Sequence, residues 1–461
     1  MPKIKLTSFG AAEEVTGSCH LLEIDDYKLL VDCGLFQGSH DNYLKNWENF
    51  SFDAKKINAV ILTHAHLDHC GRLPLLAQHG YKGKTYTTPA TSELANIILI
   101  DNQNILAEKA REQNLPLLYS PADVKKMIDS WETVNYYQEK KLSSDISFKF
   151  YHAGHILGAS IVEIKIKDHK KGTEKIIVFS GDLGGEDMPL VQNVDYLTQA
   201  DVVVMESTYG NRVHENKQDR EKKLLTAVKE VTLKNSVLII SIFAMERAQD
   251  VLKVLNDFYE NHLDFRVPVY LDSPLATAAT KIYRQHLNLL KPEVQDILKH
   301  DRDIFVFPHL KITPNSRESQ KINSAPNPKI ILAGSGMAEG GRLTHHLARY
   351  IENPSNHILF MGFQVPGTLG HELTHGAYDF DYYGKNIKVK AVVDQIDGFS
   401  AHADKNQLLK WLGCFQNKPQ IYLSHGDKTI MEEFIPTIKE KLDLNAKILK
   451  NKESVPFVFE V

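Results

Sequence analysis

The stretch that most constrains this chain is residues 57–76, INAVILTHAHLDHCGRLPLL. Its residues 59–62 are apolar and mostly β-favouring, which predicts a buried strand. Its second half carries Leu73, Leu75 and Leu76 and predicts a short amphipathic helix. Between strand and helix, three histidines and an aspartate follow the pattern H-x-H-x-D-H, so the strand-to-helix turn must accommodate four chemically active side chains.

These four side chains, His64, His66, Asp68 and His69, predict a metal site. In an extended segment alternate residues point the same way, so the first three converge, and the turn into the helix brings His69 beside Asp68. Imidazole nitrogens and carboxylate oxygens are ligands that zinc accepts. The alternative is a histidine-rich surface loop, but the position directly after a buried strand argues against it.

Other apolar strands are also followed by polar side chains. They are Asp32 after residues 28–31, His152 and His155, Asp182 in S-G-D, Glu206 in E-S-T-Y-G, and His425 in S-H-G-D. In layered α/β proteins the strand ends at one edge of a sheet form the site. A single shared edge explains all of these positions. For Asp32, the pattern leaves open a turn-capping role or the orientation of a metal-bound imidazole.

From about residue 211 the pattern changes to apolar strands alternating with helices. This predicts a second domain built on a parallel, Rossmann-like sheet that is covered on both faces. Residues 333–342, AGSGMAEGGR, link a strand to a helix there. Backbone N–H groups at such a turn can bind phosphate, and Ser335, Gly336 and Arg342 are the candidate contacts. A tight turn that merely needs glycine remains the alternative.

Composition bounds the environment and the partners. The formal net charge of −4 argues against nucleic-acid binding through overall charge, so such a substrate would need a local basic groove or bound metals. No apolar run is long enough for a membrane span, and the first residues lack the apolar region of a signal peptide. We therefore expect a cytoplasmic protein that does not contact a membrane, with its four scattered cysteines reduced.

These motifs resemble a known family. H-x-H-x-D-H, the later A-G-H and S-G-D are similar to the metallo-β-lactamase superfamily, and E-S-T-Y-G, F-S-A-H-A-D and S-H-G-D are similar to its β-CASP branch of nucleases. The resemblance implies a four-layer αββα metallo-β-lactamase fold with an inserted Rossmann-like β-CASP domain. The expected domains are residues 1–208, an insertion at 209–376, and the completion of the first domain at 377–461.

The resemblance also implies roles for individual residues. It implies two sets of zinc ligands joined by one bridging carboxylate: His64, His66 and His155; Asp68, His69 and His425; and Asp182 as the bridge. Asp32 would orient an imidazole, His402 would be the general acid and Glu206 its acidic partner, so that Asp68, Asp32, Glu206 and His402 form the catalytic set.

The expected activity is the hydrolysis of RNA phosphodiester bonds by water that two zinc ions activate, with Mn²⁺ as the other candidate metal. A histidine at position 425 resembles the RNA-acting members, so single-stranded RNA is the expected partner. Three alternatives stay open: a zinc thioesterase or lactonase, a DNA nuclease, and an inactive scaffold. The sequence also leaves open endonucleolytic against 5′-exonucleolytic cleavage and monomer against homodimer.

Overall fold

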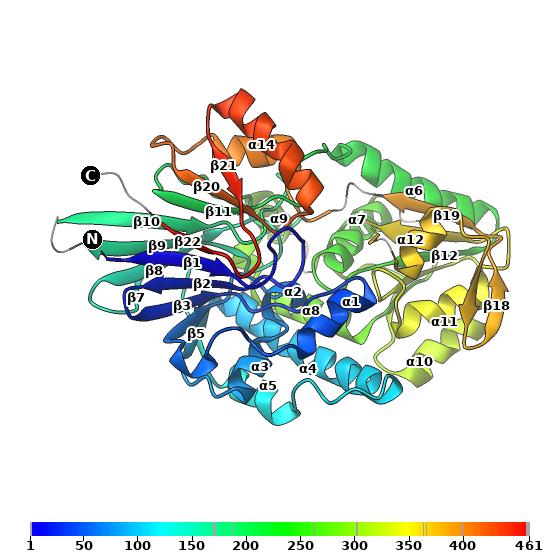
Figure 1. Cartoon of the computed structure of the whole chain (residues 1–461). Helices are drawn as coiled ribbons and strands as arrows, with labels where there is room; N and C mark the ends of the chain where they lie inside the picture. Colours follow the sequence, from blue (N-terminus) through cyan, green and yellow to red (C-terminus); the bar gives the residue numbers. More distant parts are fainter. Residues whose placement is uncertain are drawn as a thin grey trace. The chain divides into compact units, whose positions relative to one another are not determined.

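The computed structural model describes residues 2–168, 172–186, 188–262, 264–300, 303–362, 364–365, 367–396, 398 and 400–457. Contacts within the chain divide it into two units (Figure 1). The first unit comprises Met1–Glu186, Gln192–Val213 and His402–Val461, and the second comprises Asp187–Val191 and His214–Ala401. Each unit has its own sheets and its own core.

The first unit contains two seven-stranded sheets. In spatial order, the strands of one sheet are β22 (Ser454–Pro456), β1 (Ile4–Ser8), β2 (His20–Ile24), β3 (Tyr27–Val31), β4 (Ala59–Ile61), β5 (Lys84–Thr87) and β6 (Trp131–Thr133). Those of the other are β21 (Ala446–Ile448), β20 (Gln420–Ser424), β11 (Val202–Glu206), β10 (Thr173–Phe179), β9 (Ser160–Asp168), β8 (Ile146–His152) and β7 (Lys140–Lys141). Parallel pairing joins β3, β4, β5 and β6 in the first and β10, β11, β20 and β21 in the second.

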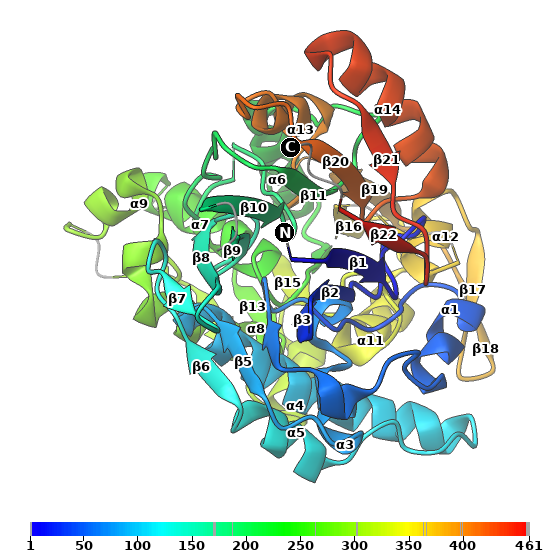
Figure 2. The same ribbon diagram turned by 60° about the vertical axis from the view of Figure 1, so that its left-hand side comes forward.

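The core of the first unit lies between these two sheets. Alternate residues of both sheets, such as Leu22, Ile61, Phe148 and Ile177, form one buried apolar cluster. Helices cover the outer faces (Figure 2): α3 (Leu73–Gln78), α4 (Pro89–Glu112) and α5 (Pro121–Ile128) on one side, α13 (Lys405–Leu412) and α14 (Lys428–Leu442) on the other. This arrangement confirms the predicted αββα layers.

Local sequence explains where these helices begin. Thr88 caps α4 by accepting a hydrogen bond from the Thr91 amide, and Pro89 fits the first helical position, where no amide hydrogen is needed. Asp404 and Gln407 form a capping box at the start of α13. The capping residue Asp404 is the last residue of the F-S-A-H-A-D motif, so the motif's position in the fold is tied to a defined helix start.

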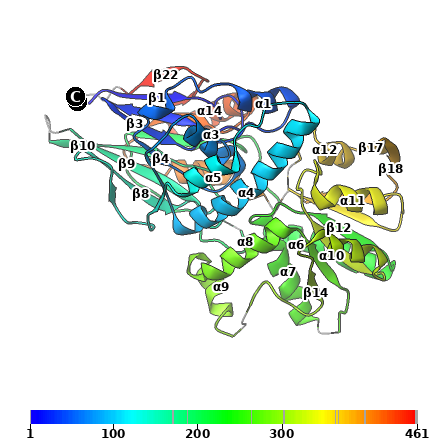
Figure 3. The same cartoon turned by 90° about the horizontal axis from the view of Figure 1, so that it is seen from below.

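The second unit is built on a six-stranded sheet in which every pairing is parallel. Its order is β14 (Leu310–Ile312), β13 (Val269–Asp272), β15 (Lys329–Ala333), β12 (Val237–Ser241), β16 (His357–Met361) and β19 (Val392–Ile396). Residues such as Ile239 and Ile331 pack with Leu343 and Leu347 of α11 (Gly341–Tyr350), while Leu238 and Ile240 face the other way and are equally buried. The predicted parallel sheet with two covered faces is therefore confirmed (Figure 3).

The other described helices of the second unit connect these strands. They are α6 (Lys217–Leu233), α7 (Arg247–Asn261), α8 (Pro274–Gln285), α9 (Pro292–Ile297), α10 (Ser316–Lys321) and α12 (Leu369–Thr374). A separate antiparallel hairpin of β17 (Asp379–Tyr382) and β18 (Lys385–Lys388) precedes β19. Because β19 pairs with β16, the second unit extends by contact to Ala401, whereas the sequence pattern placed a boundary at residue 377; the domain bounds stay a proposal.

None of the helices in the described part of the chain is long and apolar enough to cross a membrane.

Candidate metal centre

The ends of several strands of the first unit bring the predicted side chains together. His64 follows β4, Asp182 follows β10, Glu206 ends β11 and His425 follows β20. The expected extended run through Asp68 is wrong in one respect, because the helix α2 (Leu67–Cys70) starts directly after His66. Asp68 therefore lies in the first turn of a helix, which turns it away from His64 and His66 and beside His69.

The first group consists of His64, His66, His155 and Asp182, all in the first unit. His66 Nδ1 lies 3.2 Å from His64 Nε2 and 3.0 Å from His155 Nε2, and Asp182 Oδ2 lies 3.4 and 3.5 Å from the same two Nε2 atoms. Four ligands around zinc at roughly 2.0–2.1 Å would be about 3.3 Å apart, so this spacing fits a tetrahedral cation.

The protonation of this group suits a cation. Burial lowers the pKa of His64, His66 and His155, so the three imidazoles are neutral near pH 7 and each retains a lone pair. Burial alone would raise the pKa of Asp182, but the charges of the surrounding imidazoles, His425 and His69 first, hold it well below its usual range. The group thus offers three neutral nitrogens and one anionic oxygen.

The second group consists of Asp68, His69 and His425. His425 Nε2 lies 3.4 Å from Asp68 Oδ2, and Asp182 Oδ1 lies 3.2 Å from His69 Nε2 and 3.6 Å from His425 Nε2. Each carboxylate oxygen of Asp182 therefore faces a different group, which is the placement that a bridging ligand requires.

Two buried atoms at the centre lack a hydrogen bond. Among the described residues, His69 Nε2 and Asp182 Oδ1 are shielded from solvent and have no hydrogen-bond partner of good geometry. Buried polar atoms rarely stay unsatisfied, because desolvation without a partner costs about 1–3 kcal/mol or more for a charged group. A cation between these two atoms would satisfy both, so the residues present fit a metal ion.

Asp32 orients the His69 ring from the opposite side. Its Oδ2 lies 2.7 Å from His69 Nδ1, and it also accepts hydrogen bonds from the Thr63 hydroxyl at 2.9 Å and, through Oδ1, the Thr63 amide at 2.8 Å. Holding a proton on Nδ1 leaves Nε2, which lies 3.2 Å from Asp182 Oδ1, as the nitrogen that can bind a cation. Of the two readings that the sequence left open for Asp32, the geometry favours the one in which it orients an imidazole.

His402 and Glu206 form a third cluster with Asp182. His402 Nδ1 lies 3.1 and 3.2 Å from the two oxygens of Glu206 and 4.0 Å from Asp182 Oδ2. Glu206 is itself held by the Leu183 amide at 2.6 Å, and the His402 ring is 16% exposed. The pair therefore presents an imidazole at the solvent side of the metal groups, with a carboxylate behind it.

Sequence reasoning missed two hydroxyls that contact these ligands and one buried histidine beside them. The Thr63 hydroxyl lies 3.1 Å from His64 Nδ1, and the Thr208 hydroxyl lies 3.0 Å from His425 Nδ1. Thr63 directly precedes the H-x-H motif, and that adjacency could have pointed to it. His20, a buried residue of β2 whose ring contacts the hydroxyls of Ser8 at 2.8 Å and Ser424 at 3.4 Å, has no such signal, because its partners are distant in sequence.

The other histidine considered, His152, lies outside these groups. Its ring stacks on Tyr136 with centroids 3.7 Å apart, and its amide donates to Asp195 at 2.7 Å. It ends β8, whereas His155 follows the turn at Gly154, which has a φ of +72°. The turn thus brings His155, and not His152, to the metal groups.

The predicted phosphate contacts lie in the second unit and are partly engaged. Arg342 donates to Asp272 and to the Thr313 carbonyl, both at 2.6 Å, and the carbonyls of Ser335 and Gly336 accept hydrogen bonds from the Ser241 hydroxyl. The side chain of Arg342 is only 17% exposed. These residues stay predicted contacts, with Arg342 already committed to a buried ion pair.

Taken together, the paired histidine and carboxylate groups at the edge of an αββα fold define a metallo-hydrolase. Comparisons with known proteins agree along the chain. Residues 21–180 match the metallo-β-lactamase superfamily domain, residues 248–373 the Beta-Casp domain, and residues 386–449 the Zn-dependent metallo-hydrolase RNA specificity domain.

Individual relatives are similar over most of the chain. Ribonuclease TTHA0252 of Thermus thermophilus is 35% identical over 92% of this chain and 94% of its own length. The transcription termination factor FttA of Methanosarcina mazei is 32% identical over 98% of this chain and 71% of its own. A solved structure of a protein of unknown function from Enterococcus faecalis V583 shares the fold, with a TM-score of 0.55 and 14% identity over 99% of this chain and 100% of that one.

The chain therefore belongs to the β-CASP family of metallo-β-lactamase-type nucleases, and the predicted class of metal-dependent phosphodiester hydrolase is confirmed at the level of the family.

Proposed function

We propose that this protein is a zinc-dependent ribonuclease that cleaves single-stranded RNA, leaving a 5′-phosphate and a 3′-hydroxyl. The observation that carries the proposal is the pair of convergent ligand groups that share Asp182. The RNA preference is supported by the match to an RNA specificity domain and by a relative named as a ribonuclease. Mn²⁺ binds the same nitrogen and oxygen ligands, so the choice of zinc as the metal is a separate element of the proposal.

The ligand assignment follows the two groups. His64, His66 and His155 would hold one ion, Asp68, His69 and His425 the other, and Asp182 would contact both. When bound, such a pair of ions supplies an acidified water and Lewis-acid stabilisation of phosphoryl oxygens. Asp32 keeps His69 in the tautomer that can coordinate, because its carboxylate binds the Nδ1 proton.

His402 would supply the proton that the leaving 3′ oxygen needs. Its ring is partly exposed at the solvent side of the metal groups, and the Glu206 carboxylate at 3.1 Å favours the protonated imidazolium by charge pairing. Leu183 and its neighbours fix this pair, since the Leu183 amide binds Glu206 and the Leu183 carbonyl binds the amide of Ala403 at 2.6 Å. The proton donor is therefore positioned by backbone as well as by charge.

The proposal also includes the phosphate contacts, the domain bounds and the location that the sequence predicts. Ser335, Gly336 and Arg342 would contact RNA phosphates from the strand-to-helix turn of the second unit, and Arg342 would have to leave Asp272 to do so. The domain bounds 1–208, 209–376 and 377–461 and a cytoplasmic location are part of the proposal as well.

The test uses 5′-labelled single-stranded RNA and matching DNA with zinc-reconstituted wild type and His402→Ala. We expect zinc-dependent cleavage of RNA by the wild type and a loss of two to four orders of magnitude in the variant, the usual range for general acid catalysis. The product ladder separates endonucleolytic from 5′-exonucleolytic cleavage.

The same experiment separates the alternatives. Equal hydrolysis of a thioester or lactone by both proteins, with neither nucleic acid cut, would show another ester hydrolase. Preferential cleavage of DNA would show a DNA nuclease, and full zinc loading without any turnover would show a scaffold.

A further inference from the structure

The hairpin formed by β17 and β18 exposes two large aromatic rings. Tyr378 is 76% exposed and Tyr383, at the turn, is 85% exposed. The hairpin itself is anchored, because Phe380 is buried in the core of the second unit and Ile387 packs against it. Exposed aromatic side chains on an anchored element are typical of binding surfaces, since the rings contribute contact area at low entropic cost.

Positive charges without ion-pair partners lie on this hairpin, just after it, and on α11, whose His345 contacts Tyr382 of β17. Among the described residues, the side chains of Lys385, Lys390 and Arg349 form no salt bridge, although the chain as a whole carries a net charge of −4. The nearby Asp379 is already engaged, because it binds Lys388, whose ammonium also lies 5.4 Å from the centre of the Tyr378 ring. The hairpin also carries Asp381, which accepts a hydrogen bond from the Gly384 amide, and Glu352 lies 3.4 Å from the Lys388 amide, so the positive charges of Lys385, Lys390 and Arg349 exceed the nearby negative charges only slightly.

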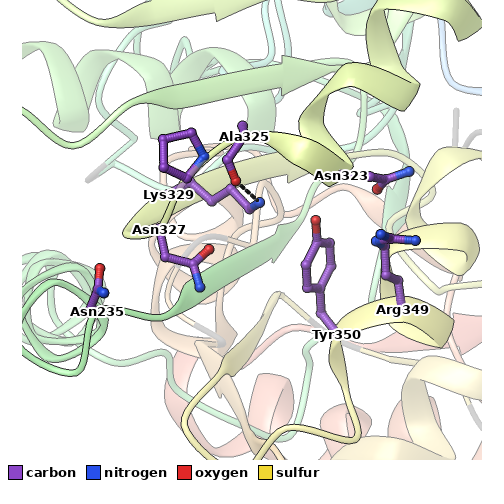
Figure 4. A pocket seen from close by; sticks show the side chains of 8 residues that line it. Asn235, Asn323, Ala325, Asn327, Lys329, Arg349 and Tyr350 are labelled. Carbon is purple, nitrogen blue, oxygen red and sulfur yellow. Dashed lines mark hydrogen bonds between the residues drawn. The ribbon is translucent and has the colours of Figure 1, made fainter.

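The same unit contains an open cavity of about 750 Å³. The chain after the hairpin is bonded next to it, because the amides of Lys390 and Ala391 both donate to the carbonyl of Ile351, at 3.0 and 2.8 Å, directly after the end of α11. The cavity is lined by Asn235, Asn323, Ala325, Pro326, Asn327, Lys329, Arg349 and Tyr350 (Figure 4). Cavities of this size can hold a nucleotide-sized group.

Most polar groups that line the cavity are not used by the protein. Within the described residues, the side-chain amides of Asn323 and Asn327 make no hydrogen bond, and the buried Tyr350 hydroxyl has none of good geometry. Burial raises the pKa of Tyr350, so this hydroxyl keeps its proton and can donate. Amide and hydroxyl groups of this kind suit the edges of nucleobases and the hydroxyls of ribose.

The C-terminal ends of α6 and α11 lie beside the cavity and carry partial negative charge. The Lys329 ammonium adds a positive charge to the lining, and it donates to the carbonyls of Ile322 and Ala325 at 2.9 and 2.8 Å. Among the described residues that line the cavity none is a carboxylate, so the full positive charges of Arg349 and Lys329 outweigh the helix dipoles. This balance favours an anionic ligand over a metal cation.

We propose that this face of the second unit, defined by Tyr378, Tyr383, Lys385 and Lys390 of the hairpin region and Arg349 of α11, binds single-stranded RNA at a site that contains none of the metal ligands. Tyr378 and Tyr383 stack on bases, the two lysines and Arg349 contact phosphates, and the adjoining amides bind base edges. The proposal rests on RNA as the substrate, and it predicts that long RNA binds more tightly than short RNA.

The experiment compares a 6-nucleotide and a 30-nucleotide unstructured RNA that share the same sequence at the 5′ end. Fluorescence anisotropy measures binding to full-length, zinc-reconstituted protein that carries His402→Ala, so that the RNA stays intact. The test variant adds Tyr378→Ala and Tyr383→Ala. The matched control adds Tyr137→Ala, which removes a 54% exposed tyrosine of the first unit.

We expect the double tyrosine variant to weaken binding of the 30-nucleotide RNA about tenfold or more, because each base–aromatic stack contributes substantially. Binding of the 6-nucleotide RNA and of the control variant should change less than twofold. Lys385→Gln with Lys390→Gln should also lower the dependence of log Kd on log salt by about 0.7 per lysine.

Three outcomes would overturn the proposal: unchanged affinity for the long RNA, an equal loss for both lengths, or a change in molar mass by light scattering without a change in RNA affinity. The last would show an interface between two copies of the chain. Because binding is measured without turnover, an inactive wild type would refute the proposed function while still leaving this face tested.

Discussion

Two buried aspartates, one in each unit, meet opposite environments. Asp182 follows β10 and is 1% exposed, and Asp272 ends β13 and is fully buried. Every oxygen of Asp272 is satisfied by hydrogen bonds, from Thr313 at 2.5 Å, Arg342 at 2.6 Å, and Ser319 and His346 at 2.7 Å. Asp182 faces imidazole nitrogens at 3.2 to 3.6 Å, and its Oδ1 has no hydrogen-bond partner among the described residues.

The comparison separates a structural carboxylate from a ligand. Burial opposes ionisation of Asp272, but hydrogen bonds from His346 and Thr313 outweigh it and lower its pKa to about 2. The protein thus completes the shell of Asp272 by itself. Around Asp182 the same burial is combined with an incomplete shell, which only a further cation can complete.

The largest difference should appear when both residues are changed to asparagine and metal content and activity are measured. Asp182→Asn removes the shared anionic ligand, so we expect less than one zinc ion per chain by mass spectrometry. RNA turnover, as kcat/KM, should fall on the order of 10³-fold. Asp272→Asn should keep its zinc. Loss of zinc from both variants would remove the distinction between the two aspartates.

When the free energy of unfolding is measured, Asp272→Asn should have a larger effect than Asp182→Asn. Asp272→Asn leaves the largely buried guanidinium of Arg342 without its counter-charge, and breaking such a pair costs about 3–5 kcal/mol. Urea denaturation of the zinc-free proteins measures this loss directly. Asp182→Asn should cost less in the zinc-free state, because it removes charge pairing with His69 and His64 at 3.2 and 3.4 Å but leaves no buried guanidinium unpaired; an equal loss would contradict this interpretation.

His20 is a third buried ionisable group, and it should make the stability of the zinc-free protein depend on pH. Burial lowers its pKa to about 4, whereas an unfolded histidine titrates near about 6.5. Between these values the unfolded chain binds more protons than the folded one, so stability falls as the pH falls, by at most about 3 kcal/mol. His20→Gln should flatten the dependence of zinc-free stability on pH in this window, whereas His40→Gln, at an exposed position, should leave it unchanged.

The smallest effect should come from changing Asp32, whose carboxylate contacts the ring of the candidate ligand His69. Asp32→Asn removes the carboxylate that orients His69, and such changes typically weaken metal binding about 10–100-fold. Competition with a chelator measures the change. Asp25→Asn is a matched control, because Asp25 has a similar positive φ, 49° against 60°, but lies in an exposed turn. Equal affinities for the two variants would mean that Asp32 only shapes its turn.

Much of the fold was predictable from local pattern. The alternation of apolar strands and helices after residue 211 predicted the parallel sheet, and the apolar runs before His64, Asp182 and His425 predicted strands. These predictions succeed because strand and helix periodicity are written in neighbouring residues. The expectation of one shared sheet edge is wrong, because β4 before His64 belongs to one sheet and β10 and β20, before Asp182 and His425, belong to the other. The limits of the second unit were harder, since β19 is assigned by its pairing partner β16 rather than by its own sequence.

What the sequence by itself determined is the set of metal-binding candidates, since histidines and carboxylates placed after buried strands can be recognised within a few residues. The tertiary structure shows His155 among the metal groups and His152 outside them, a choice that the residue pattern left open and only the family resemblance implied. It also gave Asp32 its imidazole partner and committed Arg342 to Asp272. Each of these depends on atoms that are dozens of residues apart in the chain and are brought within 3 Å only by folding. Local sequence pattern does not encode contacts between residues that are far apart in the chain. The strand that contains a residue could therefore be predicted, but its hydrogen-bond partner could be identified only in the folded chain.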